Sequence, residues 1–282
     1  MTPARNERVV LITGTSSGIG LHAAIAAGRA GHTVVATMRD LEGARALRDA
    51  ASDAQVSLDI RRLDVTEHQS VAEVVAETIA RHGRLDAVIN NAGSGRLGTI
   101  ENETVDDVRA VMEVNFFGVV ALTRAALPHL RGTRGRLITV SSVGGVIGQP
   151  FNEAYCAAKF AVEGFMESLA PVAATAGVSV TVVEPGAVAS SFVANVGRDS
   201  SQSGPANDPY AAELEAYLAR AATSFGSAQS ARSAGEVVAD LLDGDRPAFR
   251  VQTSDSARQF AAVKLSDLDG SAVQRMTAAW LG

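Results

Sequence analysis

The stretch VVLITGTSSGIG, Val9 to Gly20, decides the fold, because an apolar β-branched run ends in a glycine-rich turn. Val, Ile and Leu without polar interruptions are typical of a strand buried on both faces of a parallel sheet. Gly14, Gly18 and Gly20 then allow a tight turn, close approach of the backbone to a ligand, and close packing of the next helix. The stretch predicts the first strand, turn and helix of a nucleotide-binding α/β unit.

Six further apolar runs follow the same design. They are TVVATM (33–38), VSLDIRRLDV (56–65), LDAVINNAG (85–93), RLITVSS (136–142), VSVTVVEPG (178–186) and AFRVQT (248–253). The Ala/Leu/Glu/Arg-rich segments between them are long enough for crossover helices. We therefore expect an α/β fold in which residues 1–282 form a single domain, a doubly wound (Rossmann) parallel sheet of about seven strands with helices on both faces.

The segment after the sixth strand has a different composition. GRDSSQSGPANDP (197–209) is rich in Ser, Gly and Pro, which favours a mobile loop. In a doubly wound sheet this loop leaves the carboxyl edge, where ligands bind. We expect residues 190–235 to form a substrate loop or lid.

Composition excludes several function classes. The 25 basic and 31 acidic side chains give a net charge of −6 without a basic block, so neither nucleic acid nor an anionic membrane surface is an expected partner. The most apolar stretch, 169–183, is interrupted by Pro171 and Gly177, which argues against a membrane span. The start lacks an apolar signal core, and the one cysteine, Cys156, fits a reducing compartment, so we expect a soluble cytoplasmic protein. The five histidines show no ligand spacing, and no metal is expected.

The glycine turn predicts a diphosphate site, because the N-terminus of the next helix offers free N–H groups and a positive dipole end. Its spacing, G-x-x-x-G-x-G, differs from the G-x-G-x-x-G of many dinucleotide sites. Taken alone, the turn also fits a packing role without a ligand. The expected cofactor contacts in it are Gly14, Thr15, Ser16, Ser17, Gly18, Ile19 and Gly20.

The second strand ends in ATMRD, at the position where dinucleotide sites read the adenosine ribose. An acidic residue there favours a free 2′-OH, while Arg accepts a 2′-phosphate. Arg39 comes first, Asp40 follows, and Ser17 is placed to donate to the same phosphate, which favours NADP. The alternative is that Arg39 is a solvated surface charge.

Two further strand ends carry candidate cofactor contacts. Asp64 and Val65 follow the third strand, where a carboxylate would meet the adenine amino group and an apolar neighbour would pack beside it. Asp64 equally suits the N-cap of the next helix. At the end of the fourth strand, Asn91, Ala92 and Gly93 are small enough for the backbone to approach a ribose.

The stretch SSVGGVIGQPFNEAYCAAKF (141–160) carries the candidate chemistry. Tyr155 and Lys159 are four residues apart in a helical segment and share one helix face. A phenol has a pKa of about 10. A nearby ammonium and the positive ring of an oxidised nicotinamide lower that pKa. Ser142 is placed to bond the carbonyl or alkoxide oxygen, Lys159 also to bond the ribose, and Asn115 to hold a water.

The Tyr–Lys spacing alone occurs by chance in many proteins. Only two of the 25 basic residues are Lys, namely Lys159 and Lys264. A Lys at a helix position where this chain otherwise uses Arg indicates a need for a compact charge with a tunable pKa.

The ordered set TGTSSGIG, Asp64-Val65, NNAG (90–93), Asn115, Ser142, Tyr155, Lys159 and EPGAV (184–188) resembles the short-chain dehydrogenase/reductase family over nearly the whole chain. The resemblance implies a catalytic tetrad of Asn115, Ser142, Tyr155 and Lys159. It also implies that Tyr155 and Lys159 lie against the coenzyme and that Val188 and Ser190 meet the nicotinamide amide.

Within the family, the sequence is most similar to the branch of estradiol 17-beta-dehydrogenases and retinol dehydrogenases. The similarity rests on VVLITGTSSGIGLH, ATMRD, SSVGGVIGQPFNEAYCAAKFAVEGFMESLA and SDLDGSAV. That branch prefers NADP, with the counterparts of Ser17 and Arg39 at the 2′-phosphate, so NADP (NADPH) is the expected cofactor and NAD the lesser candidate. The chain departs from the branch at Arg220, where the estradiol enzymes carry a His that meets the steroid.

We therefore expect an NADP(H)-dependent oxidoreductase that interconverts a secondary alcohol and a ketone or aldehyde. An apolar, steroid- or retinoid-like substrate would contact Ser142, Phe151, Tyr155 and Phe192. The apolar outer face of FAVEGFMESLA (160–170) predicts a homodimer or homotetramer. Two alternatives remain: a non-catalytic NADP(H) sensor, which needs no proton donor, and a sugar-nucleotide epimerase, which shares the Tyr–Lys spacing but usually has a larger C-terminal region.

Overall fold

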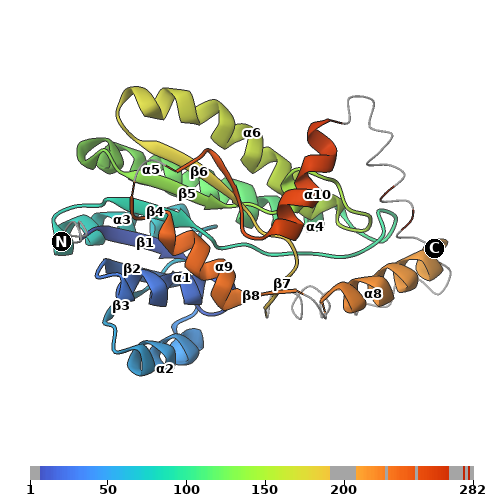
Figure 1. The fold of residues 1–282 in the computed structure, drawn as a ribbon, viewed down its shortest axis with the longest axis horizontal. Helices are drawn as coiled ribbons and strands as arrows, with labels where there is room; N and C mark the ends of the chain where they lie inside the picture. The colour runs from blue at the N-terminus through green and yellow to red at the C-terminus, as the bar shows by residue number, and fades with distance from the viewer. Residues whose placement is uncertain are drawn as a thin grey trace.

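The strands form one parallel sheet (Figure 1). The computed structural model describes residues 7–190, 208–225, 228–244 and 247–266, together with 276 and 279. The sheet order is β3-β2-β1-β4-β5-β6-β9, and every neighbouring pair is parallel. The strands are β1 (Val9–Thr13), β2 (Thr33–Met38), β3 (Leu58–Arg62), β4 (Ala87–Asn90), β5 (Arg136–Val140), β6 (Ser179–Glu184) and β9 (Arg250–Gln252). All seven predicted strands and the doubly wound fold are confirmed. The order reverses between β1 and β4, the position at which such sheets bind ligands.

Helices cover both faces of the sheet (Figure 1). One face packs around Ile12, Met38 and Val238, and the other around Leu122 and Met166. The first face is covered by α1 (Gly18–Arg29), α2 (Arg45–Ala54) and α9 (Ala231–Asp240), and the second by α3 (His68–His82), α5 (Gly118–Thr133) and α6 (Glu153–Thr175). Burial on both faces explains why the strands read as continuous apolar runs.

The remaining elements are short or lie toward the carboxyl edge of the sheet. They are η1 (Leu41–Ala44), α4 (Val105–Met112), the π-helical turn η2 (Glu113–Phe117), η3 (Val143–Gly145), β7 (Val188–Ala189), α8 (Ala211–Phe225), β8 (Gln229–Ser230) and α10 (Asp255–Leu265). α8 and α10 lie at the end of the molecule away from the N-terminus (Figure 1). The two-residue pair β7–β8 was not predicted.

The expected substrate loop, 190–235, is partly regular structure. Residues 211–225 form helix α8, and 229–235 belong to β8 and the start of α9. Residues 191–207 and 226–227 lie outside the described residues, so most of the Ser/Gly/Pro-rich segment does too. The role of 190–235 as a substrate loop or lid stays a prediction, and the Ala/Leu/Glu-rich sequence of α8 within it suits the helix that it forms.

One continuous helical segment, 105–133, is long and apolar enough to cross a membrane by length and composition. This segment was not predicted from the sequence, because charged and polar residues interrupt its apolar positions. Core helices of globular proteins pass the same test. In this chain Leu122, Ala126 and Leu130 of α5 are buried in the core beneath the sheet.

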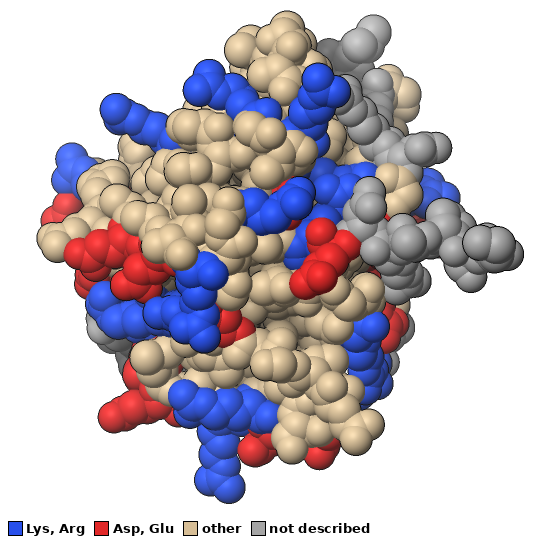
Figure 2. Space-filling view, turned by 90° about the vertical axis from the view of Figure 1, so that its left-hand side faces the viewer, with Lys and Arg blue, Asp and Glu red and all other residues tan. Residues whose placement is uncertain are grey.

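Charged side chains of both signs are mixed on the face of the molecule shown in Figure 2. Basic side chains are more prominent than acidic ones on this face, and uncharged residues lie between them.

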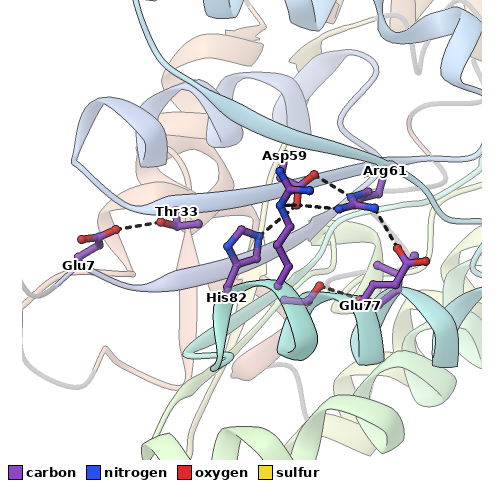
Figure 3. Close-up of polar contacts among 9 residues, drawn as sticks. Glu7, Thr33, Asp59, Arg61, Glu77 and His82 are labelled. Atoms are coloured by element: carbon purple, nitrogen blue, oxygen red, sulfur yellow. Dashed lines mark hydrogen bonds and ion pairs between the residues drawn. The ribbon is translucent and has the colours of Figure 1, made fainter.

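The edge strand β3 carries a charged network instead of an apolar face (Figure 3). Asp59 accepts hydrogen bonds from Nε of Arg61 (2.7 Å) and faces Nε2 of His82 on α3 (3.1 Å), while Arg61 reaches Glu77 (3.1 Å). Burial alone would raise the pKa of Asp59, but the bonds from Arg61 and His82 and the charge of Arg81 outweigh it, and the pKa is lowered. Charged edge strands also disfavour pairing with another chain.

We expect Asp59→Asn to destabilise the protein by about 1–2 kcal/mol at pH 7, the size of a lost hydrogen bond to a charged group. Because the folded-state pKa is depressed, this stabilisation is complete above the unfolded pKa of about 3.9 and disappears as the pH falls through the folded value. Urea denaturation at pH 7 and at about pH 2, below the unfolded pKa, measures it. The control is Glu77→Gln, at a more exposed partner of Arg61, which should cost less than about 0.5 kcal/mol. Equal effects of the two variants would contradict the assignment.

Candidate active site

The turn between β1 and α1 has a backbone that suits glycine alone. The φ angles of Gly14 and Gly18 are 69° and 60°, in the left-handed region. A Cβ on Gly14 would lie 2.8 Å from the Cα of Ala92, and one on Gly20 would overlap the carbonyl oxygen of Gly14. The turn thus brings bare backbone and the N-terminus of α1 to the switch point of the sheet, an arrangement that binds phosphate groups.

Asn91 fixes this turn to the end of β4. Its Nδ2 donates to the carbonyl oxygens of Thr13 (2.9 Å) and Gly14 (3.0 Å). The backbone N–H groups of Asn91 and Ala92 both donate to Oγ1 of Thr13 at 3.0 Å. The side chain of Asn91 therefore bonds the backbone of the turn and holds the turn to the end of β4.

Thr15 and Ser16 connect the turn to its neighbours. Both N and Oγ1 of the buried Thr15 donate to the carbonyl oxygen of Thr37, at 3.0 and 3.1 Å. A Cβ on Gly43 would lie 3.9 Å from Cβ of Ser16, so η1 sits beside the turn. Ser17 occupies the N-cap position of α1.

Predicted nicotinamide contacts lie beside the same turn. Ile19 packs against the small cluster formed by Val188, Ala231 and Ala234. Ser190 faces the turn from the end of β7, since a Cβ on Gly18 would lie 3.4 Å from Cβ of Ser190. Residues about 170 positions apart in the sequence are thus brought to one place.

At the end of β2, Asp40 and Arg39 have different surroundings. The Asp40 carboxylate accepts a hydrogen bond from the Glu42 N–H (2.9 Å) and caps η1. Arg39 is exposed, and its side chain makes no ion pair or hydrogen bond with any residue that the structure describes. The guanidinium of Arg39 is therefore available to an anion near the turn.

Asp64 caps a turn, but it is not the helix N-cap considered above. Its Oδ1 accepts bonds from N and Oγ1 of Thr66, at 3.0 and 2.8 Å, whereas the N-cap residue of α3 is Glu67. Val65 packs against α5, because a Cβ on Gly118 would lie 2.8 Å from Cβ of Val65. These partners account for both side chains without a ligand, and the adenine role stays a prediction.

Ser142, Tyr155 and Lys159 come together at the carboxyl edge of the sheet. Ser142 follows β5, its Oγ accepts a hydrogen bond from the Gly144 N–H (3.0 Å), and its side chain is also bonded to the Tyr155 hydroxyl. Tyr155 lies in the first turn of α6. One turn further on, Nζ of Lys159 donates to the Val140 carbonyl (3.0 Å) and lies 5.7 Å from the centre of the Tyr155 ring.

The protonation equilibria of these groups are shifted in opposite directions. Burial raises the pKa of Tyr155 to about 12, and the bond from Ser142 offsets only part of this. Burial lowers the pKa of Lys159 to about 8, with a smaller opposing contribution from Glu163. The expectation that Lys159 lowers the pKa of Tyr155 is thus not met in the protein alone, because desolvation of the phenol dominates and Nζ is directed at a backbone carbonyl. At neutral pH the phenol is protonated, the state that a proton donor requires.

Asn115 lies in the π-helical turn between α4 and α5 and is completely buried. Its Nδ2 donates to the carbonyl oxygens of Ser94 (2.8 Å) and Val111 (2.9 Å), and its Oδ1 accepts from the Ser94 N–H (3.3 Å). A Cβ on Gly93 would lie 2.9 Å from this Oδ1 and 3.7 Å from Nζ of Lys159. Asn115 therefore fixes the 93–94 backbone next to Lys159, and π turns are frequent at functional sites.

Of the predicted substrate residues, Phe151 is buried beside this constellation and Phe192 lies outside the described residues. The ring of Phe151 packs edge-on against Tyr217 of α8, with centroids 5.6 Å apart. Its φ of 59° is an outlier for a bulky side chain, and such strain clusters at functional sites. Nδ2 of Asn152 donates to the Tyr217 hydroxyl (2.9 Å), which ties α8 to the segment that carries Phe151.

The family model described as short chain dehydrogenase matches residues 8–201, more than half of the chain. The chain belongs to the short-chain dehydrogenase/reductase family. It is 37% identical to retinol dehydrogenase 8 of Bos taurus over 94% of this chain and 87% of that protein. It is 36% identical to estradiol 17-beta-dehydrogenase 1 of Rattus norvegicus over 94% and 79%. A short-chain dehydrogenase from Streptomyces avermitilis has the same fold, with a TM-score of 0.78, 30% identity and 97% of both chains covered.

This short-chain dehydrogenase/reductase is therefore an oxidoreductase of the type that uses NAD(P) on alcohols and carbonyl compounds. The turn at Gly14–Gly20 fits such a dinucleotide, because a Cβ would fill the cradle that the glycines leave open. When bound, NAD(P) supplies or accepts the hydride.

A charged group behind Lys159 was not predicted from the sequence. There the buried Glu163 of α6 and Glu184 of β6 meet the half-buried guanidinium of Arg250 of β9. Of these three residues, Glu163 could have been predicted to lie near Lys159, because it follows Lys159 by four residues on the same helix face. Arg250 is 87 residues away from Glu163, and no local pattern connects the two.

Proposed function

We propose that this protein is an NADP(H)-dependent oxidoreductase that interconverts a secondary alcohol and a ketone or aldehyde on an apolar substrate. The observation that carries the proposal is the constellation of Ser142, Tyr155 and Lys159 at the carboxyl edge, beside the glycine turn. A protein that only bound the coenzyme would have no use for a buried phenol bonded to a serine and backed by an ammonium group.

In this proposal, each part of the coenzyme is bound by a different set of residues. The turn from Gly14 to Gly20 would hold the diphosphate, and Arg39 with Ser17 the 2′-phosphate of the adenosine ribose. Asp64 and Val65 would meet the adenine. Asn91, Ala92, Gly93, Tyr155 and Lys159 would lie along the nicotinamide ribose, and Val188 and Ser190 at the nicotinamide amide.

Tyr155 would act as the proton donor in the direction of reduction. Its pKa of about 12 keeps the phenol protonated at neutral pH, and the Ser142 hydroxyl beside it would hold the substrate oxygen that receives the proton. Lys159, with a pKa of about 8, is mostly an ammonium at pH 7 and would stabilise the phenolate left behind.

An apolar substrate is in keeping with the buried aromatic pair of Phe151 and Tyr217, four residues before Tyr155 in the chain and in α8 respectively. The names of two relatives refer to retinol and estradiol, and both are largely apolar alcohols. We therefore propose a steroid- or retinoid-like substrate class.

The coenzyme preference gives a direct prediction for Arg39. We expect Arg39→Asp to lower the ratio of kcat/KM with NADPH to kcat/KM with NADH by about 10- to 100-fold, because a hydrogen bond to a charged group contributes about 1.5–3 kcal/mol. Arg45→Asp is the matched control, since it makes the same charge change at a side chain that is 91% exposed on α2. A ratio that stays the same in Arg39→Asp contradicts the proposed NADP preference.

The function is tested by incubating the purified chain with NADPH, and separately with NADH, and a panel of steroid ketones, retinals and small ketones. Consumption of NADPH with an apolar member of the panel is the expected result. Tight NADPH binding without turnover of any ketone, aldehyde or corresponding alcohol would overturn the proposal and favour the sensor alternative.

We also propose that the chain forms a homodimer or homotetramer. Phe160 and Val172 of α6 and Phe117 of η2 are large apolar side chains that remain exposed. Covering such side chains with a second copy would remove apolar surface from water. Light scattering on the purified chain decides the point, and a monomeric mass at micromolar concentration would contradict it.

A further inference from the structure

A buried carboxyl group lies one helical turn behind Lys159. Glu163 of α6 is 5% exposed, and residues four apart on a helix share one face. Burying a carboxylate is costly unless its charge is compensated or lost by protonation. The surroundings of Glu163 therefore decide whether it carries a charge.

The guanidinium of Arg250 contacts three carboxyl groups at this position. Nε of Arg250 lies 3.2 Å from Oε2 of Glu163 and 3.3 Å from Oε1 of Glu184, and its Nη2 lies 2.8 Å from Oε2 of the exposed Glu167. A single N–H cannot make two well-directed bonds to both buried carboxylates. Glu184 also accepts a hydrogen bond at its other oxygen from Nε2 of Gln252 (2.9 Å), so Glu163 is the buried carboxyl group that depends more on the shared donor. Two buried carboxyl groups that meet at one N–H disfavour the state in which both are charged.

The remaining contacts of Glu163 do not resolve this competition. The Ser141 hydroxyl is close enough to favour the charged form of Glu163. Within the part of the chain that the structure describes, however, Oε1 of Glu163 and Oγ of Ser141 have no partner in good hydrogen-bond geometry. Burial, with Glu184 adding to it, raises the pKa of Glu163 to about 7, against the opposing effects of Ser141 and Arg250.

Four of the elements packed around Glu163 carry charged side chains, and one does not. Lys159 and Glu167 lie on its own helix, Glu184 on β6 and Arg250 on β9. η3 contributes Gly145, which is uncharged. From α10, Lys264 lies over the ring of Phe160, about one turn earlier on α6.

Lys159 and Glu163 pack against the same short helix, η3. A Cβ on Gly145 would lie 3.1 Å from both the Lys159 carbonyl oxygen and Cγ of Glu163, so no side chain fits between η3 and this part of α6. A charge on Glu163 favours the ammonium form of Lys159. The charge of the carboxyl group is therefore felt at the lysine.

We propose that Glu163 is a positioning residue for Lys159: its carboxyl group, which competes with Glu184 for Arg250, holds or releases a proton behind the lysine and thereby sets the fraction of Lys159 that is charged. As the pH rises through the titration of Glu163, the new negative charge keeps Lys159 protonated to a higher pH. The catalytic consequence rests on the proposed function, whereas the coupling of the two charges is a property of the chain alone.

The chain's two lysines make a direct test possible. In a Lys264→Arg background, lysine labelled with ¹³C at Cε gives one NMR signal, that of Lys159, whose titration in the full-length protein reports its pKa. Glu163→Gln is expected to lower this pKa by about one unit. Glu167→Gln is the matched control, because Glu167 also contacts Arg250 but is 61% exposed, and it should leave the midpoint unchanged.

The same midpoint in Glu163→Gln as in the parent would overturn the proposal. If Glu163→Gln does not fold, the parent protein decides: its Lys159 signal should titrate in two steps, one from Glu163 and one from Lys159, and a single step contradicts the coupling. With a ketone substrate, the basic limb of the kcat/KM profile should shift to lower pH in Glu163→Gln. Absence of any turnover by the parent would count against the proposed function, while the NMR titration would still decide the role of Glu163.

Discussion

Tyr155→Phe is expected to lower kcat/KM for ketone reduction by about 10³-fold, within the range of about 10²–10⁴ that general acid catalysis contributes. The substitution removes only the hydroxyl oxygen, which is bonded to Ser142, and keeps the ring that packs at the first turn of α6. NADPH should bind as it does to the wild type, because the glycine turn and the end of β2 are unchanged. Steady-state kinetics and fluorescence titration with NADPH measure the two quantities separately.

The chain offers a matched control among its three tyrosines. Tyr210→Phe removes the same atom from an exposed side chain at the start of α8 and should leave kcat/KM unchanged. Retention of activity within about tenfold of wild type in Tyr155→Phe, less than the smallest effect expected of a general acid, would contradict its role as proton donor.

Lys159→Met should have the second-largest effect, a loss of about 10²-fold or more in kcat/KM, because the charge that stabilises the phenolate is removed. The stability of the fold should change little. Replacing a buried charge by an apolar side chain of similar length is often neutral or stabilising, which offsets the cost of about 1 kcal/mol for the lost bond to the Val140 carbonyl. Loss of activity with an unchanged Tm therefore separates a chemical role from a structural one.

Lys264→Met is the control for this variant, since Lys264 is exposed on α10 and is the only other lysine. It should retain full activity. If Lys159→Met kept its activity, or lost activity only in proportion to a lowered Tm, the ammonium group would have no part in the reaction.

The central strands of the sheet were predictable because β1, β4 and β5 are short, mostly apolar runs that are buried along their whole length. Val10, Leu11 and Ile12 have no exposed surface, and the four predicted ends beyond β1, β2, β4 and β5 all reach the carboxyl edge. The pair β7–β8 was missed because two residues in each strand carry no periodicity. The same holds for the π turn at Asn115, which reads locally as an ordinary helix.

The candidate site was predictable where spacing along one element sets geometry. Tyr155 and Lys159 are an example, since four residues on α6 place both groups on one face. The pKa of Tyr155 was not predictable, because it depends on how deeply the phenol is buried and on Lys159 pointing to the Val140 carbonyl. The cluster of Glu163, Glu184 and Arg250 is likewise a tertiary feature that three separate elements create.

The central claim is that the Tyr155 hydroxyl gives its proton to a substrate oxygen beside the bound coenzyme. A crystal structure of the chain with NADP and a ketone or alcohol ligand tests it most directly. We expect the ligand oxygen within about 2.6–3.2 Å of the Tyr155 hydroxyl, the reach of a catalytic hydrogen bond, with the nicotinamide ring against the reacting carbon. A hydroxyl turned away from the nicotinamide, with packed side chains between the two, would contradict the account.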